Sequence, residues 1–543
     1  MDDSDDSKKP PKSVEDVQKE LQDFIKDKFG GNVMAFPMGP GGMGAPAAEE
    51  PVTAGEDEVP AVPPEVLSFD MTPRQVKSYL DRYVIGQDDA KRTLAVAICD
   101  HYNHVRRSLS SAEVDPAAAA RSRDVCGDLE ARSNVEYVKQ NVILLGPTGV
   151  GKTYLVRILA QLIGVPFVKA DVTKFSETGY VGGDVEDLVR ELVRAVDGNV
   201  QLASHGIVFL DEVDKIASAR TPQGRDPSGR GVQVGLLKLM EETEVSLRNP
   251  MDLSAQFQDM LQTRRGGGGQ STINTKHILF VVSGAFSGLP EIIEKRLSER
   301  NVGFAAAANA EDIETLSGEL LPGATTKDFV DYGFEPEFVG RLPVRVALSE
   351  LDADDLYRIL TTSEGSILRQ YRQNFADYGI EVAFEDDALR AVAREAAEEK
   401  TGARGLMSVL ERCLRDFKFH LPGGPIRRLA VTTDVVEDSG ASLEAVRADP
   451  QSAESLYWHA LVREFENEFA RRYGVKLSLD EESVGMAVTQ AGESGVTVKE
   501  HLWSTFEDHV DFLRKIVEKS GKVELPVTPQ VLSKPGAGVE VWM

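Results

Sequence analysis

The chain has 543 residues, a net charge of −27 and a pI of about 4.8, and hydrophobic residues make up 41% of it. This length suffices for about two to four domains with sizeable cores. The acidic balance disfavours a nucleic-acid partner, because an acidic protein gains nothing from the phosphate backbone. Cys99, Cys126 and Cys413 are too far apart for a Cys₄ zinc site or a disulfide framework, and no apolar run is long enough to cross a bilayer. Composition therefore predicts a cytoplasmic protein with no zinc and no membrane partner.

Residues 1–65 form an acidic segment with 15 acidic residues, 6 lysines and 9 of the 26 prolines. Such a composition cannot bury enough apolar surface to fold alone, so we expect most of this tail to be disordered. Within it, residues 13–29 carry Val14, Val17, Leu21 and Phe24 at helical spacing. This stretch is either a short docking helix or a weakly helical, solvated tail.

Residues 66–345 alternate between short apolar strands and helical patterns. The expected strands are residues 141–145, 165–170, 206–210 and 277–282. Between them lie helical patterns such as Val185–Val196 and Val232–Glu242, whereas the polar stretch Thr221–Gly231 is expected to be a loop. Continuous apolar strands separated by helices predict an α/β fold, a parallel sheet covered by helices on both faces.

A phosphate-binding loop pattern follows the first of these strands. It consists of Gly146, Pro147, Thr148, Gly149, Val150, Gly151, Lys152 and Thr153, and Tyr154 continues into an amphipathic helix. Glycines let backbone N–H groups approach phosphate oxygens, and the helix N-terminus adds a favourable dipole. We expect Lys152 to reach the β- and γ-phosphates of ATP, and Thr153 to ligate Mg²⁺.

Further candidates for the chemistry stand at the ends of later strands. Asp211 and Glu212 end an apolar strand, where Asp211 would support Mg²⁺ and Glu212 would polarise the attacking water. Ser283, at the end of the next strand, is placed to sense the γ-phosphate, although on its own a serine at a strand end is more often a cap. Positive charge against the transition state would come from Arg341 and Arg404, although on spacing alone each could be a surface arginine.

The remainder of the chain divides into two parts. Residues 346–437 are expected to be mostly helical with one or two short strands. Residues 438–543 contain a faint echo of that part, because the stretch from Tyr473 resembles the stretch from Tyr378 in spacing and character. The echo indicates either a duplicated small subdomain or only the common pattern of a strand before a capped helix.

From about Tyr83 to Val436, the chain resembles the ClpX family of AAA+ unfoldases. The matching segments occur in the family's order and spacing; they are 83–87, 146–153, 179–185, 210–215, 225–233, 284–286, 337–343 and 401–405. The related unfoldase HslU shares several of them. The resemblance implies a large AAA+ subdomain at 66–345, a small one at 346–437, and a C-terminal extension at 438–543.

The resemblance also implies roles for individual residues. Tyr83, Val84 and Ile85 match the stretch that cradles adenine. Arg341 matches an arginine finger that reaches the nucleotide of the neighbouring subunit, and Arg404 matches the sensor that contacts the nucleotide of its own subunit. A finger supplied in trans requires a ring, and the family forms homo-hexamers.

Two further segments match family motifs that contact the substrate polypeptide and the protease. Tyr180 and Val181 match the family's pore loop, where an aromatic beside an aliphatic residue grips a polypeptide without reading its sequence. Val302, Gly303 and Phe304 stand where the family has its docking tripeptide for the ClpP protease. The family's N-terminal zinc-binding domain is not matched, and residues 438–543 have no counterpart in the family's usual chain.

The sequence thus predicts a bacterial, cytoplasmic ATPase that unfolds and threads tagged or unfolded proteins, using ATP and Mg²⁺, and delivers them to a ClpP-type protease. The alternative is a stand-alone remodelling or scaffold ATPase with no protease partner. A nucleotide-binding module without turnover is disfavoured, because every hydrolytic residue is present.

Overall fold

The computed structural model describes residues 69–114, 139–175, 183–217, 227–247, 272–300, 318–521, 524–538 and 542. All of them belong to one compact unit, Pro60–Met543. The expected tail and its helix at 13–29, the pair Tyr180 and Val181, and the tripeptide 302–304 lie outside the described residues.

A five-stranded parallel sheet forms the first part of the molecule, the sheet region (residues 69–348). Its strand order is β2-β3-β6-β1-β7. The strands are β1 (Val142–Leu145), β2 (Phe167–Asp171), β3 (Ile207–Asp211), β6 (Leu279–Gly284) and β7 (Val344–Ala347). The α/β class and the four expected strands are confirmed to within two residues. The fifth strand, β7, was not expected; it pairs with β1, Val142 opposite Val344.

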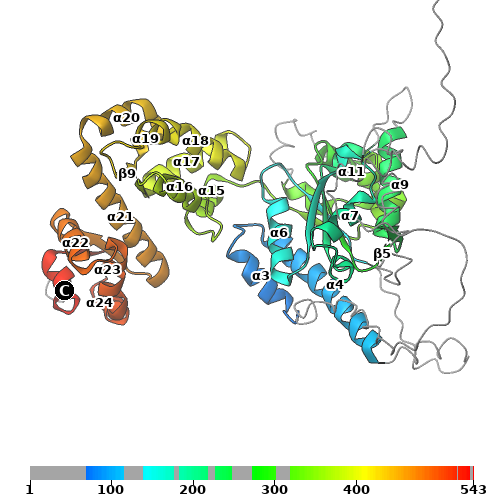
Figure 1. The fold of residues 1–543 in the computed structure, drawn as a ribbon, viewed down its shortest axis with the longest axis horizontal. Coiled ribbons are helices and arrows are strands. Elements are labelled where there is room, and N and C mark those ends of the chain that lie inside the picture. Colours follow the sequence, from blue (N-terminus) through cyan, green and yellow to red (C-terminus); the bar gives the residue numbers. More distant parts are fainter. Residues whose placement is uncertain are drawn as a thin grey trace, which may run out of the picture. The chain divides into compact units, whose positions relative to one another are not determined.

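Helices cover both faces of this sheet (Figure 1). Because side chains alternate along a strand, Ile143 and Leu145 enter one core, while Val142 and Leu144 enter the other. The first core includes α7 (Asp187–Arg194), α9 (Pro227–Met240), α11 (Leu289–Arg300), α13 (Thr326–Tyr332) and α14 (Pro336–Gly340). The second includes α3 (Pro73–Asp81), α4 (Asp88–Val114) and α6 (Lys152–Ile163).

Short elements complete the sheet region. They are the 3₁₀ turns η1 (Val172–Lys174), η2 (Val213–Ile216) and η3 (Leu321–Gly323), the helix α8 (Val200–Ala203), and the antiparallel pair β4 (Glu244–Ser246) and β5 (Thr272–Asn274). One expectation was wrong: the stretch 227–231 is not a loop but the start of α9. Proline favours the first turn of a helix, where a backbone N–H has no intrahelical partner.

A second group of elements, the helical region (residues 349–448), has a hydrophobic core of its own. It contains α15 (Ala353–Thr361), α16 (Ile367–Ala376), β8 (Glu381–Phe384), α17 (Asp386–Glu398), α18 (Ala403–His420), β9 (Arg428–Val431), α19 (Thr433–Glu437) and α20 (Ser439–Ala448). β8 and β9 form a parallel pair. The expectation of a mostly helical part with one or two short strands is confirmed.

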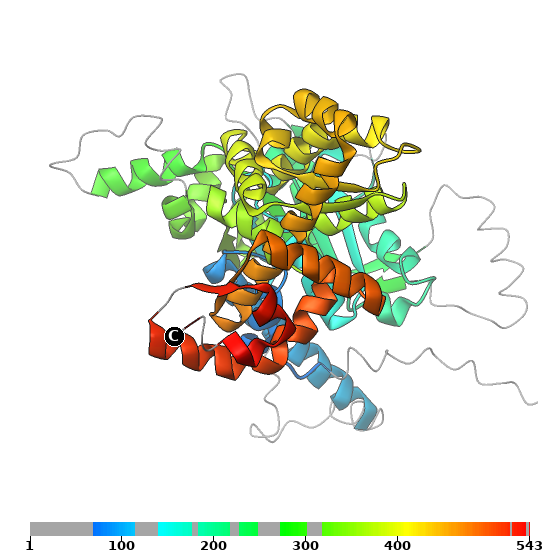
Figure 2. The same cartoon turned by 90° about the vertical axis from the view of Figure 1, so that its left-hand side faces the viewer.

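The C-terminal region (residues 449–542) also has a hydrophobic core of its own and is orange to red in Figure 2. Its elements are α21 (Pro450–Tyr473), β10 (Lys476–Leu479), α22 (Glu481–Ser494), α23 (Val498–Phe506), η4 (Glu507–His509), α24 (Val510–Ser520), β11 (Glu524–Val527), α25 (Pro529–Ser533) and η5 (Pro535–Gly538). β10 and β11 are also parallel. None of the described helices is both long and apolar enough to span a membrane.

Candidate nucleotide site

The loop 146–151 connects β1 to α6 at the carboxyl edge of the sheet. Lys152 is the first residue of α6, and Gly151 before it has φ 93, in the left-handed region. The Lys152 ammonium donates to the carbonyl oxygens of Gly146 and Pro147 at 2.6 and 2.7 Å. Burial lowers the pKa of Lys152 to about 8, opposed by Asp211 and Asp214, and the nearby charge of Arg404 lowers it further. The loop therefore holds a partly desolvated cation at a helix start, the arrangement that binds phosphate.

The N-terminus of α18, from the helical region, packs directly on this loop. The Ala403 N–H donates to the Gly149 carbonyl oxygen at 3.0 Å. The approach is so close that a Cβ atom on Gly149 would lie 1.9 Å from the Thr401 carbonyl oxygen. Gly149 also has φ 83, so glycine is required there for two independent reasons. Arg404, the second residue of α18, is thereby brought beside the loop.

Three polar side chains meet where β2, β3 and α6 converge. The Thr153 hydroxyl donates to Asp211 Oδ2 at 3.5 Å. Lys169 Nζ lies 2.8 Å from Asp211 Oδ2 and donates to Thr153 Oγ1 at 3.3 Å. The two oxygens expected to hold Mg²⁺ thus converge on one cation already, the ammonium of Lys169. Sequence reasoning missed Lys169; the signal was a lysine in an otherwise apolar strand.

Glu212 and Ser283 stand on the neighbouring strand ends. Glu212 follows β3 with φ 58, and its backbone N–H donates to Asp211 Oδ1 at 3.2 Å. A non-glycine residue in this conformation costs about 1–3 kcal/mol, and such strain persists mainly at functional sites. Ser283 is fully buried in β6, and its hydroxyl has no hydrogen-bond partner among the described residues.

Arg341 lies at the amino ends of the parallel strands, whereas Lys152 lies at their carboxyl ends. Its carbonyl oxygen accepts from the Asn141 side chain at 3.1 Å, immediately before β1, whereas the 146–151 loop follows β1. At about 3.3 Å per residue, the strand separates Asn141 from Gly146 by roughly 16 Å. The Arg341 guanidinium is half-exposed and pairs with Glu241 at 2.5 Å. The structure therefore does not bring Arg341 to the loop of its own chain.

The segment 83–85 is held between the sheet region and the helical region. Val84 and Ile85 are buried, and Lys91 donates to the Val84 carbonyl oxygen at 3.1 Å. The Ser363 hydroxyl donates to the Tyr83 carbonyl oxygen at 2.8 Å. Sequence reasoning missed Ser363 and its neighbours, since no periodic pattern marks a polar turn whose partners lie some 280 positions earlier in the chain.

Two protein families match parts of this sequence. The family described as AAA domain (Cdc48 subfamily) matches residues 138–345, and the family described as C-terminal, D2-small domain, of ClpB protein matches residues 351–417. Together, the parallel sheet, the loop before α6 and the acidic end of β3 define an AAA ATPase.

Curated relatives narrow this class. The chain is 40% identical over 368 residues to the ATP-dependent Clp protease ATP-binding subunit ClpX of Borrelia duttonii (strain Ly), which covers 67% of this chain and 78% of that protein. It is 38% identical over 386 residues to ClpX 3 of Methylococcus capsulatus, covering 70% and 83%. The chain belongs to the ClpX family. The predicted resemblance and ATPase activity are thereby confirmed, and the general class is a Clp-type, ATP-dependent unfoldase.

Proposed function

We propose that this chain hydrolyses ATP in a homo-hexameric ring, threads polypeptides through the central pore and delivers them to a ClpP-type protease. Within one chain, Lys152 and the N–H groups of its loop would bind the phosphates, and Glu212 would polarise the attacking water. Thr153 and Asp211 would hold Mg²⁺; their convergence on the Lys169 ammonium supports a cation site there. Bound Mg²⁺ would neutralise charge on the phosphates.

The observation that carries the ring is the position of Arg341. Phosphoryl transfer needs positive charge against the developing negative charge, and Arg341 stands at the far edge of its own sheet. An exposed guanidinium on that edge is available to the nucleotide of a second subunit. Arg404, in contrast, lies beside the loop of its own chain, which supports a role in cis.

Two parts of the proposal rest on residues outside the described ranges. Tyr180 and Val181 would grip the polypeptide, and Val302, Gly303 and Phe304 would dock the protease. Around the first pair, Phe175 and Gly183 form a bridge, and the Gly183 N–H donates to the Lys174 carbonyl oxygen at 3.1 Å. The two described residues that flank the undescribed segment 176–182 are therefore held against each other directly after η1.

Mixing variants tests the ring. Glu212→Gln should bind ATP but not hydrolyse it, and Arg341→Ala should do the same, because each lacks one half of a shared site. Mixed rings of the two variants should regain part of the turnover, since some interfaces combine an intact Glu212 with an intact Arg341. Absence of turnover in the mixture, with ring assembly verified by light scattering, would contradict supply in trans.

A degradation assay tests the rest. Tyr180→Ala should keep ATP turnover and lose unfolding of a tagged fluorescent substrate. Phe304→Ala should keep unfolding and lose degradation when ClpP from the same cell is added. If the wild-type chain unfolds substrate but never associates with ClpP, the stand-alone remodelling ATPase is the correct function.

A further inference from the structure

The C-terminal region lies beyond both family matches and repeats the element order of the helical region. In each, a helix leads to a strand, further helices, a second strand parallel to the first, and a short final helix. The first set is α16, β8, α17, α18, β9 and α19, and the second is α21, β10, α22, α23 with α24, β11 and α25. Both strand pairs are in register over four residues.

Individual positions repeat as well. A Tyr-Gly pair precedes each first strand, and Gly379 and Gly474 have φ 73 and 71. Each ladder opens with an ion pair across the strands, Arg428 with Glu381 at 3.2 Å and Lys476 with Glu524 at 3.1 Å. The same pair with its charges exchanged between the strands is expected of two diverged copies.

The copies differ where the first one meets the nucleotide loop. α18 begins after Gly402 without a side-chain cap, and its free end contacts Gly149. α23 instead begins at a complete capping box formed by Thr497 and Glu500. Its second residue is Lys499, the position of Arg404 in α18, and Lys499 pairs with Glu464 at 3.2 Å and Glu468 at 2.6 Å. The second copy thus satisfies its helix start and its cation internally.

α21 attaches this second copy to the first. Its first half covers the outer face of β8 and β9, where Ala383 and Ala430 pack with Tyr457 and Ala460. The corresponding residues of β10 and β11 are Ser478, partly exposed, and Pro526, exposed. This face of the second strand pair is thus less buried than its counterpart in the first pair.

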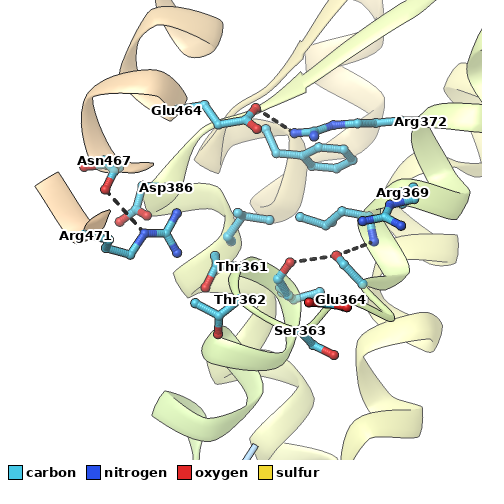
Figure 3. Close-up of a pocket in the computed structure, with 15 residues that line it drawn as sticks. Thr361, Thr362, Ser363, Glu364, Arg369, Arg372, Asp386, Glu464, Asn467 and Arg471 are labelled. Atoms are coloured by element: carbon cyan, nitrogen blue, oxygen red, sulfur yellow. Dashed lines mark hydrogen bonds and ion pairs between the residues drawn. The ribbon is translucent and has the colours of Figure 1, made fainter. Parts of the chain in front are cut away.

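The second half of α21 borders a pocket of about 290 Å³ (Figure 3). Across it, Glu464 accepts from Arg372 of α16 at 2.7 Å, and on its other side from Lys499 at 3.2 Å. The opposite wall of the pocket is the turn 361–366. Glu464 thus joins both copies on the side of the pocket that faces this turn.

The far side of the turn 361–366 contacts the segment expected to bind adenine. Arg82 binds the Glu364 carboxylate with two bonds of 2.7 and 2.9 Å, and Ser363 binds the Tyr83 carbonyl. Gly365 is so close to Tyr154 that a Cβ atom there would lie 2.2 Å from the phenol oxygen. The turn is therefore held against the nucleotide segment on one side, and on its other side it lines the pocket opposite α21.

We propose that the C-terminal region is a second, degenerate copy of the small subdomain which no longer contacts nucleotide and instead positions the first copy. Glu464 is the positioning residue: through Arg372 it fixes α16, which continues directly from the turn 361–366 packed on Tyr83, and it thereby sets the affinity for ATP. This inference rests on the proposed ATP site and on the adenine-binding role that the family resemblance implies for Tyr83.

The test uses the full chain. Glu464→Gln should raise the Kd of a fluorescent ATP analogue and the KM for ATP about three- to fivefold, and kcat should not change. This is the range expected when a partly exposed charge network is broken. Hydrogen exchange at Glu364, whose N–H donates to the Arg82 carbonyl oxygen, should accelerate. Glu454→Gln is the matched control, because Glu454 lies on the same helix but pairs with Arg428, away from the turn; it should change neither quantity.

Other outcomes separate the two proposals. An unchanged Kd and unchanged exchange in Glu464→Gln overturn the positioning role, as does an equal change in Glu454→Gln. Tyr83→Ala tests the underlying assignment: if it leaves ATP affinity intact, the adenine role of Tyr83 is wrong. The wild-type chain and Lys499→Gln should both bind one nucleotide per chain. If the wild-type chain binds two nucleotides and Lys499→Gln only one, the second copy does contact nucleotide and the proposal is wrong.

Discussion

The contact between α18 and the nucleotide loop predicts the effect of a single methyl group. Gly402 has φ 62 and ψ −144, and a Cβ atom there would lie 2.7 Å from the Gly149 carbonyl carbon. An alanine cannot remain in this place, so Gly402→Ala should move the start of α18, and Arg404 with it, away from the loop. A strained backbone of this kind costs about 1–3 kcal/mol. If ATP binding bears this cost, its Kd rises about 5- to 140-fold.

Titration of the full chain with a fluorescent ATP analogue measures this effect, and thermal unfolding followed by circular dichroism verifies that the variant is folded. Gly495→Ala is the matched control. Gly495 also has positive φ, 69, but no atom of the described residues lies within 4 Å of the added Cβ atom. It should lose about 1 kcal/mol of stability and no ATP affinity. Wild-type affinity in Gly402→Ala would refute the argument that close packing on Gly149 places Arg404.

Two further predictions concern buried or shared charges. Lys169→Met should tighten Mg²⁺ binding about fivefold in a calorimetric titration with nucleotide present, because the ammonium 2.8 Å from Asp211 competes for the same oxygens; unchanged or weaker binding would contradict this competition. Burial raises the pKa of Glu466 to about 7 from an unfolded value of 4.5, so the stability gained from its protonated form is complete below pH 4.5 and is lost as the pH rises through 7. Glu466→Gln keeps an acceptor for the Leu479 N–H and should remove up to about 3 kcal/mol of this pH dependence. The free energy of opening measured by hydrogen exchange in α21 and β10 should then change less between pH 4.5 and 7 than in the wild type. Identical pH profiles for both proteins would exclude the role of Glu466.

The sequence predicts the elements whose signal is local. Apolar runs such as residues 206–210 mark buried strands, and the spacing of Gly146, Gly151 and Lys152 marks the loop without reference to any partner. The start of α9 at Pro227 had a local signal too, but the polar composition around it outweighed the proline.

The features that were missed depend on distant partners. β7 is a strand of four residues containing Arg345, and only its pairing with β1, about 200 positions earlier, makes it part of the sheet. The position of Lys169 in the site is evident only from its ion pair with Asp211 on the neighbouring strand. Likewise, the motif around Arg341 identifies the arginine, but the sheet is needed to show that it faces away from its own loop.

The continuity of α21 also has a consequence for how the molecule unfolds. With 24 residues the helix is about 36 Å long; Tyr457 and Ala460 pack on the face of β8 and β9, and Phe465 and Phe469 pack in the core of the C-terminal region. Loosening either end frays a helix on which the other depends, so the two cores should melt as one cooperative unit. A truncated chain ending at Ala448 would expose Ala383 and Ala430 and become prone to aggregation, which makes Asp449 a poor boundary for expressing the ATPase alone.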